Sequence, residues 1–261
     1  MRTDPEAQWL VFTDLDGTLL DHDTYDHRPA LPALNRLRRE GIPVIPATSK
    51  TLAELEELAR ILGLSGPQVA ENGSVIALPG PPPRITIAPP GYAGVRAFLS
   101  QCRQRIGWRF RGFADMSPRE IAAHTGLSPE QAAHAAQRLA SEPMLWLGSP
   151  EDKDLFCTHA SEQGFRVLQG GRFLHLLGDT DKGRALRAVA GSWGGAVRTI
   201  ALGDSPNDSD LLLAADVPVI VRRKDGSHLM LPQRPDVLIT DAAGPTGWNQ
   251  AISQLLDRAG E

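Results

Sequence analysis

Blocks of hydrophobic and polar positions alternate along the start of the chain in the way expected for strands followed by helices. The run Trp9–Thr13 is apolar and β-rich and ends in a polar, glycine-containing segment, which indicates a buried strand. The next block has leucines at helical spacing, at Leu31, Leu34 and Leu37. An apolar stretch at 42–47 predicts a second strand, and a leucine stripe behind Thr51 predicts a second helix.

The same alternation returns after residue 181. The pattern predicts a helix at 182–190, a strand at 197–202, a helix through 211–214 and a strand at 217–221. Strands that alternate with helices favour a parallel, doubly wound sheet. The expected fold class is therefore α/β, with a Rossmann-like parallel-sheet core whose two halves are separated in the sequence.

The segment between these halves has a different pattern. Residues 79–90 contain six prolines, which is the clearest change of composition in the chain. Serine-proline pairs typical of helix starts then recur, at Ser117, Ser128 and Ser149. With short strand candidates around them, they predict an inserted α+β cap domain at 83–178. The catalytic core would comprise 1–82 and 179–261.

Composition and charge narrow the class of protein. The 261 residues carry a net charge of −4 without a basic run, which argues against a nucleic-acid partner. No apolar run reaches the roughly 18–20 residues that a membrane span needs. The first residues are not patterned like a signal peptide, and Cys102 and Cys157 show no paired spacing. We therefore expect a cytoplasmic globular protein that does not associate with membranes.

Two aspartates directly follow the first predicted strand, in the segment Asp14-Leu15-Asp16-Gly17-Thr18. Ligands of a parallel α/β sheet bind beyond the carboxyl ends of its strands, so both carboxylates fall where an active site is expected. Carboxylates this close repel each other unless a cation or a shared proton compensates them. A divalent cation with oxygen ligands, Mg²⁺ above all, meets that need. The alternative is a solvated acidic turn.

A second acidic cluster follows the predicted strand at 197–202, in the segment from Gly203 to Asp208. If this strand lies beside the first, Asp204 can reach the same cation as Asp14. The alternative is a polar loop in which Asn207 or Asp208 caps the next helix. The sequence thus predicts that aspartates from two distant segments converge on one metal ion.

Two further segments have groups that can hold a phosphate. Thr48 follows the second predicted strand, where its hydroxyl and the free N–H groups of the next helix can bind phosphate oxygens. Capping of that helix by Ser49 or Thr51 is the alternative. Lys182 begins the helix after the insertion and can neutralise a phosphoryl group, although lysine is more often simply exposed.

In their order along the chain, these segments resemble the haloacid dehalogenase superfamily of phosphatases. The resemblance implies a Rossmann-like core, a cap domain and a Mg²⁺ cofactor, and the place of the insertion is similar to the subclass with a large α/β cap. Within it the chain is most similar to mannosyl-3-phosphoglycerate phosphatases. The stretches that match this group are 19–21 with Tyr25, 48–51, 71–73 and 169–175.

The resemblance also implies which residues carry out the chemistry and bind the metal. Asp14 would be the nucleophile and a metal ligand. Asp16 would act as general acid and base, and its backbone carbonyl would also touch the metal. Asp204 would complete the metal ligands, and Asp208 would support them from behind.

The remaining expected roles concern binding. Thr48, Lys182 and Asn207 would hold the phosphoryl group. From the cap, Arg172 and His175 would reach the carboxylate or the sugar of the substrate, and Arg172 suits a carboxylate because its planar fork binds it bidentately. The alternative for His175 is a residue packed within a strand.

The hypothesis that results is a Mg²⁺-dependent hydrolysis of mannosyl-3-phosphoglycerate to mannosylglycerate and phosphate through an aspartyl-phosphate. Glucosyl-3-phosphoglycerate or another sugar phosphate is the alternative substrate, and phosphomannomutase-like phosphotransfer is the alternative reaction. A regulatory or binding protein that has lost catalysis is the alternative from another class. The expected partner is a small phosphorylated sugar acid, bound by a monomer or homodimer.

Overall fold

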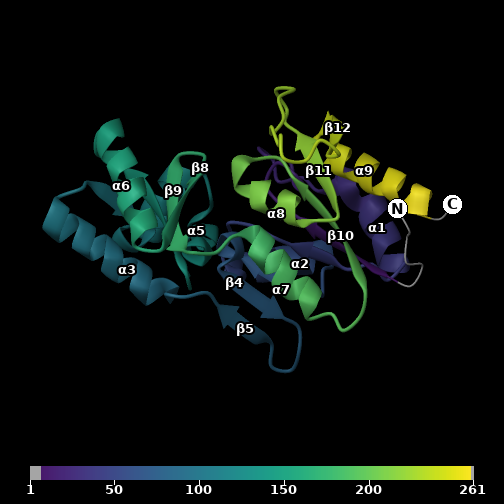
Figure 1. Ribbon diagram of the computed structural model, residues 1–261, viewed down its shortest axis with the longest axis horizontal. Helices are drawn as coiled ribbons and strands as arrows, with labels where there is room; N and C mark the ends of the chain where they lie inside the picture. The colour runs from purple at the N-terminus through teal and green to yellow at the C-terminus, as the bar shows by residue number, and fades with distance from the viewer. Residues whose placement is uncertain (1–6, 260–261) are drawn as a thin grey trace. The chain divides into compact units, whose positions relative to one another are not determined.

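The computed structural model describes residues 7–259, and these form two compact units (Figure 1). The first unit contains the described part of Met1–Thr48, together with Arg60–Val69 and the chain from Asp181 onward. The second unit contains Ser49–Ala59 and Ala70–Thr180. No helix within the described residues has the length and apolar content needed to cross a membrane.

A five-stranded parallel sheet lies at the centre of the first unit, in the order β12-β11-β10-β1-β2. Its strands are β1 (Gln8–Thr13), β2 (Val44–Pro46), β10 (Val197–Gly203), β11 (Val217–Arg222) and β12 (Leu238–Ala243). Both faces of such a sheet are covered, which explains why β1 is a continuous apolar run rather than an alternating one. The expected α/β class with a parallel sheet is confirmed.

The position of β1 within this sheet determines where the site can form. β1 pairs with β2 on one side and with β10 on the other, with Thr13 opposite Leu202. After β1 the chain continues to β2 on one side, and the later strands β10, β11 and β12 lie on the other side. Ligands of doubly wound sheets bind at such a switch point, outside the carboxyl ends of the two central strands.

Helices pack around this sheet as the leucine spacing predicts. Those that belong wholly to the first unit are α1 (Leu31–Arg39), α7 (Lys182–Gly191), α8 (Ser209–Ala214) and α9 (Gly244–Ala259). In α1, Leu34 and Leu37 are buried, whereas Leu31 begins the helix at the surface. α2 (Leu52–Leu62) also forms where its leucine stripe predicts. β12 and α9 were not predicted from the sequence.

The second unit contains a four-stranded antiparallel sheet in the order β6-β7-β9-β8. Its strands are β6 (Phe110–Gly112), β7 (Ser141–Trp146), β8 (Phe165–Gly170) and β9 (Phe173–Gly178), and its helices are α3 (Gly91–Gln101), α4 (Pro118–Thr125), α5 (Pro129–Ala135) and α6 (Pro150–Glu162). A separate small sheet has the order β3-β4-β5, from β3 (Gln68–Ala70), β4 (Val75–Leu78) and β5 (Arg84–Ile87). The predicted domain bounds, 83–178 against the remainder, stay a prediction.

The serine-proline pairs start three helices of the second unit as predicted. Ser117, Ser128 and Ser149 each accept a hydrogen bond from the backbone N–H three residues later, ahead of α4, α5 and α6. Two elements were missed near the prolines. β5 is exposed at every position, so it lacks the alternation that marks a strand. α3 directly follows the proline-rich stretch, although its buried residues Val95, Phe98 and Leu99 have helical spacing.

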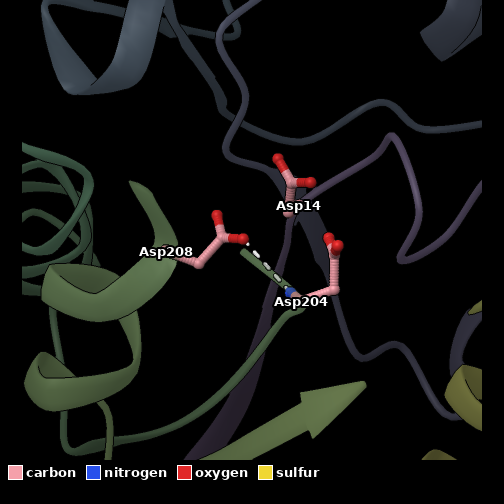
Figure 2. Close-up of side chains that lie close together, drawn as sticks. All are labelled: Asp14, Asp204 and Asp208. Atoms are coloured by element: carbon pink, nitrogen blue, oxygen red, sulfur yellow. Dashed lines mark hydrogen bonds between the residues drawn. The ribbon is translucent and has the colours of Figure 1, made fainter. Parts of the chain in front are cut away.

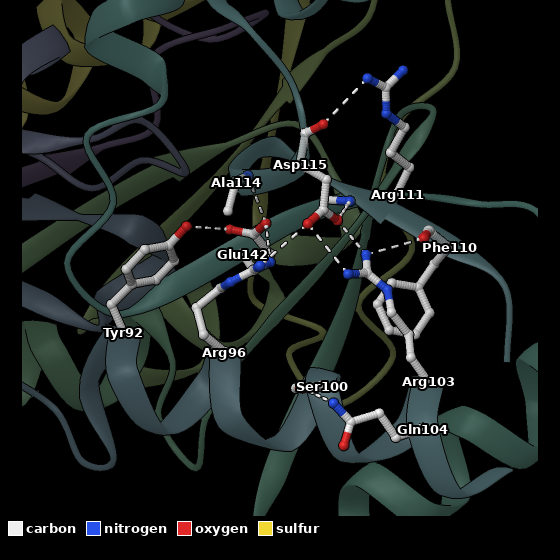
Figure 3. Close-up of polar contacts among 11 residues, drawn as sticks. Tyr92, Arg96, Ser100, Arg103, Gln104, Phe110, Arg111, Ala114, Asp115 and Glu142 are labelled. Atoms are coloured by element: carbon white, nitrogen blue, oxygen red, sulfur yellow. Dashed lines mark hydrogen bonds and ion pairs between the residues drawn. The ribbon is translucent and has the colours of Figure 1, made fainter. Parts of the chain in front are cut away.

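A polar network ties α3 to the antiparallel sheet of the second unit (Figure 3). Glu142 in β7 is fully buried and accepts hydrogen bonds from the Tyr92 hydroxyl at 2.7 Å and from Arg96 at 3.2 Å. Arg96 also pairs with Asp115 at 3.2 Å, and Arg103 pairs with the same carboxylate. These charges are compensated within the network, which is the condition for burying them.

Asp115 is the member of this network whose titration is most informative. Burial raises the pKa of Asp115, but hydrogen bonds from Arg103 and from the Gly112 N–H outweigh burial and lower it to about 2. A carboxyl whose pKa is lower in the folded chain than in the unfolded chain stabilises the fold when ionised. That stabilisation is present above the unfolded pKa of about 4 and is lost as the pH falls toward 2.

We expect Asp115→Asn to lower the free energy of unfolding at neutral pH by about 1–2 kcal/mol, a modest value because water reaches part of the carboxyl. The difference from the parent should be smaller at about pH 3 than at about pH 6, because the Asp115 carboxyl of the unfolded parent takes up a proton over that range, while the folded one, with a pKa of about 2, stays largely ionised. Urea unfolding at both pH values measures it. Asp154→Asn, at an exposed position of α6, is the matched control. An equal difference at both pH values would contradict the assigned pKa.

Candidate active site

Asp14 lies directly beyond the carboxyl end of β1. Its backbone N–H donates to the Leu202 carbonyl of β10 at 2.9 Å, which continues the pairing of the two central strands. The chain then turns sharply at Gly17, whose φ of +86° is in the left-handed region. A Cβ on Gly17 would lie 3.1 Å from an Asp204 carboxylate oxygen, so glycine satisfies both the backbone conformation and the close approach.

Asp204 occupies the equivalent place beyond β10 and is held from two directions. The Thr18 hydroxyl donates to its Oδ1 at 3.0 Å, so the turn after Gly17 orients the carboxylate directly. The Arg223 guanidinium donates to the Asp204 carbonyl at 2.7 Å and lies 3.6 Å from its Oδ2. The two segments that sequence analysis expected to converge are thus in contact.

Asp208 completes a cluster of three buried carboxylates with Asp14 and Asp204 (Figure 2). Ligand oxygens of the three lie within 4.8 Å of one another. Asp208 belongs to a short 3₁₀ turn, and its Oδ2 accepts from the N–H groups of Asp204 at 3.2 Å and Ser205 at 3.0 Å. The loop after β10 is therefore closed by hydrogen bonds from its first residues to the Asp208 carboxylate.

Lys182 is the cation of this cluster. It is the first residue of α7, is 1% exposed, and donates through Nζ to Asp14 Oδ1 at 2.8 Å and to Asp208 Oδ1 at 2.6 Å. Burial lowers the pKa of Lys182, but Asp14 and Asp208 raise it by more, so it stays above the usual lysine value and the ammonium keeps its charge. The structure thus rules out an exposed lysine at this position.

The remaining predicted residues of the first unit lie around this cluster. Asp16 forms a β-bridge with Leu20 in the turn, and its charge contributes to raising the pKa of Asp14. Thr48 is 1% exposed and follows β2, with its N–H donating to the Val69 carbonyl at 3.0 Å. Asn207 lies in the turn before Asp208 and accepts a hydrogen bond from the Ser205 hydroxyl.

The two predicted cap residues lie in the second unit. Arg172 is exposed in the turn before β9, and its guanidinium donates to the His124 carbonyl at 2.6 Å. His175 lies within β9, is 8% exposed and stands opposite Pro143 on one side and Leu168 on the other. Their proposed contacts with substrate stay a prediction.

Comparison with known proteins identifies the family. A family model described as haloacid dehalogenase-like hydrolase matches residues 11–80. The chain is 36% identical to a glucosyl-3-phosphoglycerate/mannosyl-3-phosphoglycerate phosphatase from Methanococcoides burtonii, over 95% of the chain and 97% of that protein. A protein of the same name from Persephonella marina is 33% identical over the same shares of both chains. The chain belongs to the haloacid dehalogenase-like hydrolases. The predicted resemblance is confirmed, and the enzyme is a phosphoric monoester hydrolase.

Solved structures of haloacid dehalogenase-like hydrolases have the same fold. A phosphatase of this superfamily from Bacteroides thetaiotaomicron superposes with a TM-score of 0.71 at 17% identity, covering 100% of this chain and 97% of its own. The sucrose-phosphatase of Synechocystis sp. has a TM-score of 0.62 at 20% identity, covering 95% and 98%. At these identities the likeness shows the fold alone.

The electrostatics of the hydrolase site fit a bound divalent cation. Burial, and then the neighbouring charge of Asp208, raise the pKa of Asp14 well above its usual value despite Lys182. Burial and Asp208 likewise raise the pKa of Asp204 to about 6. The carboxylates thus carry more negative charge than Lys182 and Arg223 compensate. Their donors are hard oxygens, the ligands that Mg²⁺ prefers.

The hydrogen bonds divide the carboxylates into two groups. Both oxygens of Asp208 already accept hydrogen bonds, one from Lys182 and the other from backbone N–H groups. Its geometry therefore suits support of Lys182 and of the loop, as the resemblance implied. Asp14 and Asp204 are better placed to hold the metal. Coordination by the Asp16 backbone carbonyl stays a prediction.

Two residues of this arrangement were not singled out from the sequence. Thr18 was treated only as part of its motif, whereas its hydroxyl orients Asp204. Arg223 was missed, although it directly follows β11 and so lies at the carboxyl end of a strand, the position used to choose the aspartates. A basic residue that directly follows a predicted strand is as good a candidate for the site as an acidic residue in that position.

We expect Mg²⁺ to stabilise this hydrolase against heat. A ligand at about 100 times its dissociation constant adds about 2.7 kcal/mol to the free energy of unfolding, which corresponds to a Tm increase of roughly 5 °C for a chain of this size. Asp204→Asn should lose most of this increase because it removes one of the carboxylates predicted to hold the metal. Thermal unfolding with and without Mg²⁺ measures it, and Asp154→Asn should respond like the parent. An undiminished increase in Asp204→Asn would place the metal elsewhere.

Proposed function

We propose that this hydrolase removes phosphate from mannosyl-3-phosphoglycerate and glucosyl-3-phosphoglycerate, with Mg²⁺, through an aspartyl-phosphate on Asp14. The names of the two relatives, similar over 95% of the chain, support the substrate class. The observation that carries the reaction is the contact of buried Lys182 with Asp14 at 2.8 Å, beside Asp204. This contact supports the proposal, because it would bring a nucleophile, a cation and metal ligands together at one switch point of the sheet.

The chemistry needs a covalent route because phosphate monoesters hydrolyse extremely slowly without a catalyst. Enzymes accelerate such reactions by up to about 10²¹-fold. An Asp14 carboxylate oxygen would attack phosphorus while the bond to the substrate oxygen breaks, and the leaving alkoxide would take a proton from Asp16. Water, deprotonated by Asp16, would then attack the same phosphorus, releasing inorganic phosphate and restoring Asp14.

Charge neutralisation accounts for much of the remaining acceleration. Lys182 would stabilise the negative oxygens of the transferring phosphoryl group, and Thr48 and Asn207 would hold them by hydrogen bonds. A Mg²⁺ ion bound by Asp14, Asp204 and the Asp16 carbonyl would supply further positive charge to those oxygens. The Thr18 hydroxyl would keep Asp204 aimed at the ion.

The glycerate carboxylate distinguishes the proposed substrates from plain hexose phosphates. We assign its recognition to Arg172, whose exposed guanidinium has the planar fork that binds carboxylates bidentately. His175 would contact the sugar. A requirement for a carboxylate gives strong selection, because a site built around a charged group loses much of its binding energy when that group is missing.

The covalent step predicts the effect of replacing Asp14. Asp14→Asn should reduce phosphate release by at least about 10³-fold, because an amide cannot serve as the nucleophile. The fold should survive, since asparagine still offers an oxygen to Lys182. Phosphate release and thermal unfolding are measured together, with Asp154→Asn as the charge-matched control. Activity within tenfold of the parent would rule out the covalent route.

The substrate proposal predicts the order of activities across a panel. With Mg²⁺, mannosyl- and glucosyl-3-phosphoglycerate should both be hydrolysed with kcat/KM at least about 100-fold above mannose 6-phosphate and glucose 6-phosphate, because only the former carry the carboxylate. Release of inorganic phosphate measures the panel, and analysis of the sugar product separates hydrolysis from phosphotransfer. A preference for a plain hexose phosphate would overturn this proposal and leave the phosphatase assignment intact.

A further inference from the structure

Two buried hydrogen bonds in series connect the C-terminal helix α9 to the main chain of Asp14. The Trp248 indole Nε1–H donates to the Thr13 hydroxyl at 3.0 Å, and that hydroxyl donates to the Asp14 carbonyl at 2.7 Å. Trp248 and Thr13 are both 0% exposed. All three residues belong to the first compact unit, so the series lies within the body that carries Asp14.

The chemistry of the three groups fixes the direction of both bonds. An indole nitrogen can only donate, and a carbonyl oxygen can only accept. The Thr13 hydroxyl must therefore accept from Trp248, and its single proton is left for Asp14. Hydrogen bonds in series also polarise one another in a buried setting, so the indole strengthens the hydroxyl as a donor.

The packing of α9 explains how the indole reaches this position. α9 contacts β11, β12 and α1, and Trp248 is among its fully buried side chains. The neighbouring Gly247 allows the close approach, because a Cβ there would lie only 2.1 Å from the Ala242 carbonyl of β12. A side chain at 247 would push the helix from the sheet and take the indole with it.

Thr13 is the one polar residue among the buried positions of β1. The buried residues that precede it in β1 are Leu10, Val11 and Phe12. Valine has nearly the same shape as threonine and an equal or better strand propensity, so packing alone does not call for a hydroxyl at this place. The hydroxyl is used by the two hydrogen bonds, and one of them ends on Asp14.

The main chain of Asp14 is held on both sides as a result. Its N–H donates to Leu202 at 2.9 Å and its carbonyl accepts from Thr13 at 2.7 Å. In a trans peptide the carbonyl and the next N–H point in opposite directions, so the second bond also orients the Leu15 N–H. The peptide planes on either side of the Asp14 Cα are thereby fixed, and with them the direction in which its side chain leaves the backbone.

We propose that Trp248 and Thr13 are positioning residues that hold the Asp14 carboxylate in line for attack, through its backbone rather than through its side chain. The proposal rests on the assigned role of Asp14 as the nucleophile. Misplacing a reacting group by a fraction of an ångström costs rate while leaving substrate affinity largely unchanged. Losses should therefore fall on kcat and not on KM.

The test measures steady-state kinetics with p-nitrophenyl phosphate in excess Mg²⁺, together with thermal unfolding. Thr13→Val removes the hydroxyl and should lower kcat by about tenfold or more, with KM within about twofold. Trp248→Phe leaves the hydroxyl in place but removes its donor, so a smaller kcat loss of about threefold is expected. The double variant should be no slower than Thr13→Val, because without the hydroxyl the indole has nothing to act through. Thr13→Ser should restore most of the parental kcat.

Matched controls separate positioning from stability. Thr199→Val makes the same change at a buried threonine of β10 whose hydroxyl bonds Asp216, and Trp193→Phe removes an indole that donates to Gln8. Both should change the Tm without lowering kcat. If Thr13→Val does not fold, the kcat of Trp248→Phe alone tests the proposed positioning role.

Three results would overturn the proposal: parental kcat in Trp248→Phe, losses that multiply in the double variant, or a change confined to KM. The choice of p-nitrophenyl phosphate keeps this test separate from the proposed substrate. A chain that cleaves it but ignores both glycosyl phosphoglycerates would contradict the substrate and still test the positioning role. A parental activity that survives Asp14→Asn would contradict the role of Asp14 itself.

Discussion

The buried ammonium of Lys182 lies between the carboxylates of Asp14 and Asp208, and the rest of the site depends on this ion pair. A buried charge that loses its partner typically costs 3–5 kcal/mol, so the burial of each of the three groups depends on the others. They come from three elements: the end of β1, the start of α7 and the turn after β10. Satisfying Lys182 thus forces segments far apart in the sequence to meet at one point.

The ion pair leaves an excess of negative charge in the site, and this excess favours the binding of a cation. Asp14, Asp16, Asp204 and Asp208 together exceed the charge of Lys182 and Arg223, and burial increases the cost of that excess. Without a bound cation, burial and this excess of negative charge raise the pKa values of Asp14 and Asp204. A divalent cation would lower the cost of this excess further, because it would compensate both carboxylates without protonating Asp14, the proposed nucleophile. The same crowding that disfavours the empty site favours the occupied one.

The parts of this arrangement that the sequence predicts share one feature: they stand at the end of a strand or at the start of a helix. Asp14 and Asp204 could be paired because both end apolar runs, and parallel strands bring their carboxyl ends to one edge. Thr48 was chosen because it follows a predicted strand and Lys182 because it begins a predicted helix, and the family resemblance supports both. The serine caps of α4, α5 and α6 were readable because capping is local chemistry. Predictions succeeded where position along an element determines position in space.

Residues that support the site residues through tertiary contacts could not be predicted from their position along a strand or helix. Trp248 belongs to a helix whose apolar pattern is that of any helix packed on a sheet, so nothing local distinguishes an indole that reaches β1 from one that merely fills the core. Thr13 resembles an ordinary strand residue, and Arg223 a surface arginine, until their partners are known. These contacts depend on tertiary packing, such as the close approach of Gly247 to β12, which periodicity does not encode.

Residues that contact the phosphate and residues that hold them in place also differ in how freely they can vary. Groups that touch the phosphate are constrained by the chemistry, because charge, metal affinity and nucleophilicity leave few residue types that serve. The groups that hold them are constrained only by geometry, and any donor that reached the Asp14 carbonyl would satisfy the same requirement. On the proposed assignment of Arg172 and His175 to substrate binding, substrate preference can therefore change in the second unit without disturbing the ion pair at Lys182. The proposed positioning role of Trp248, by contrast, would tie the rate of the reaction to the packing of α9, the helix that carries this buried indole.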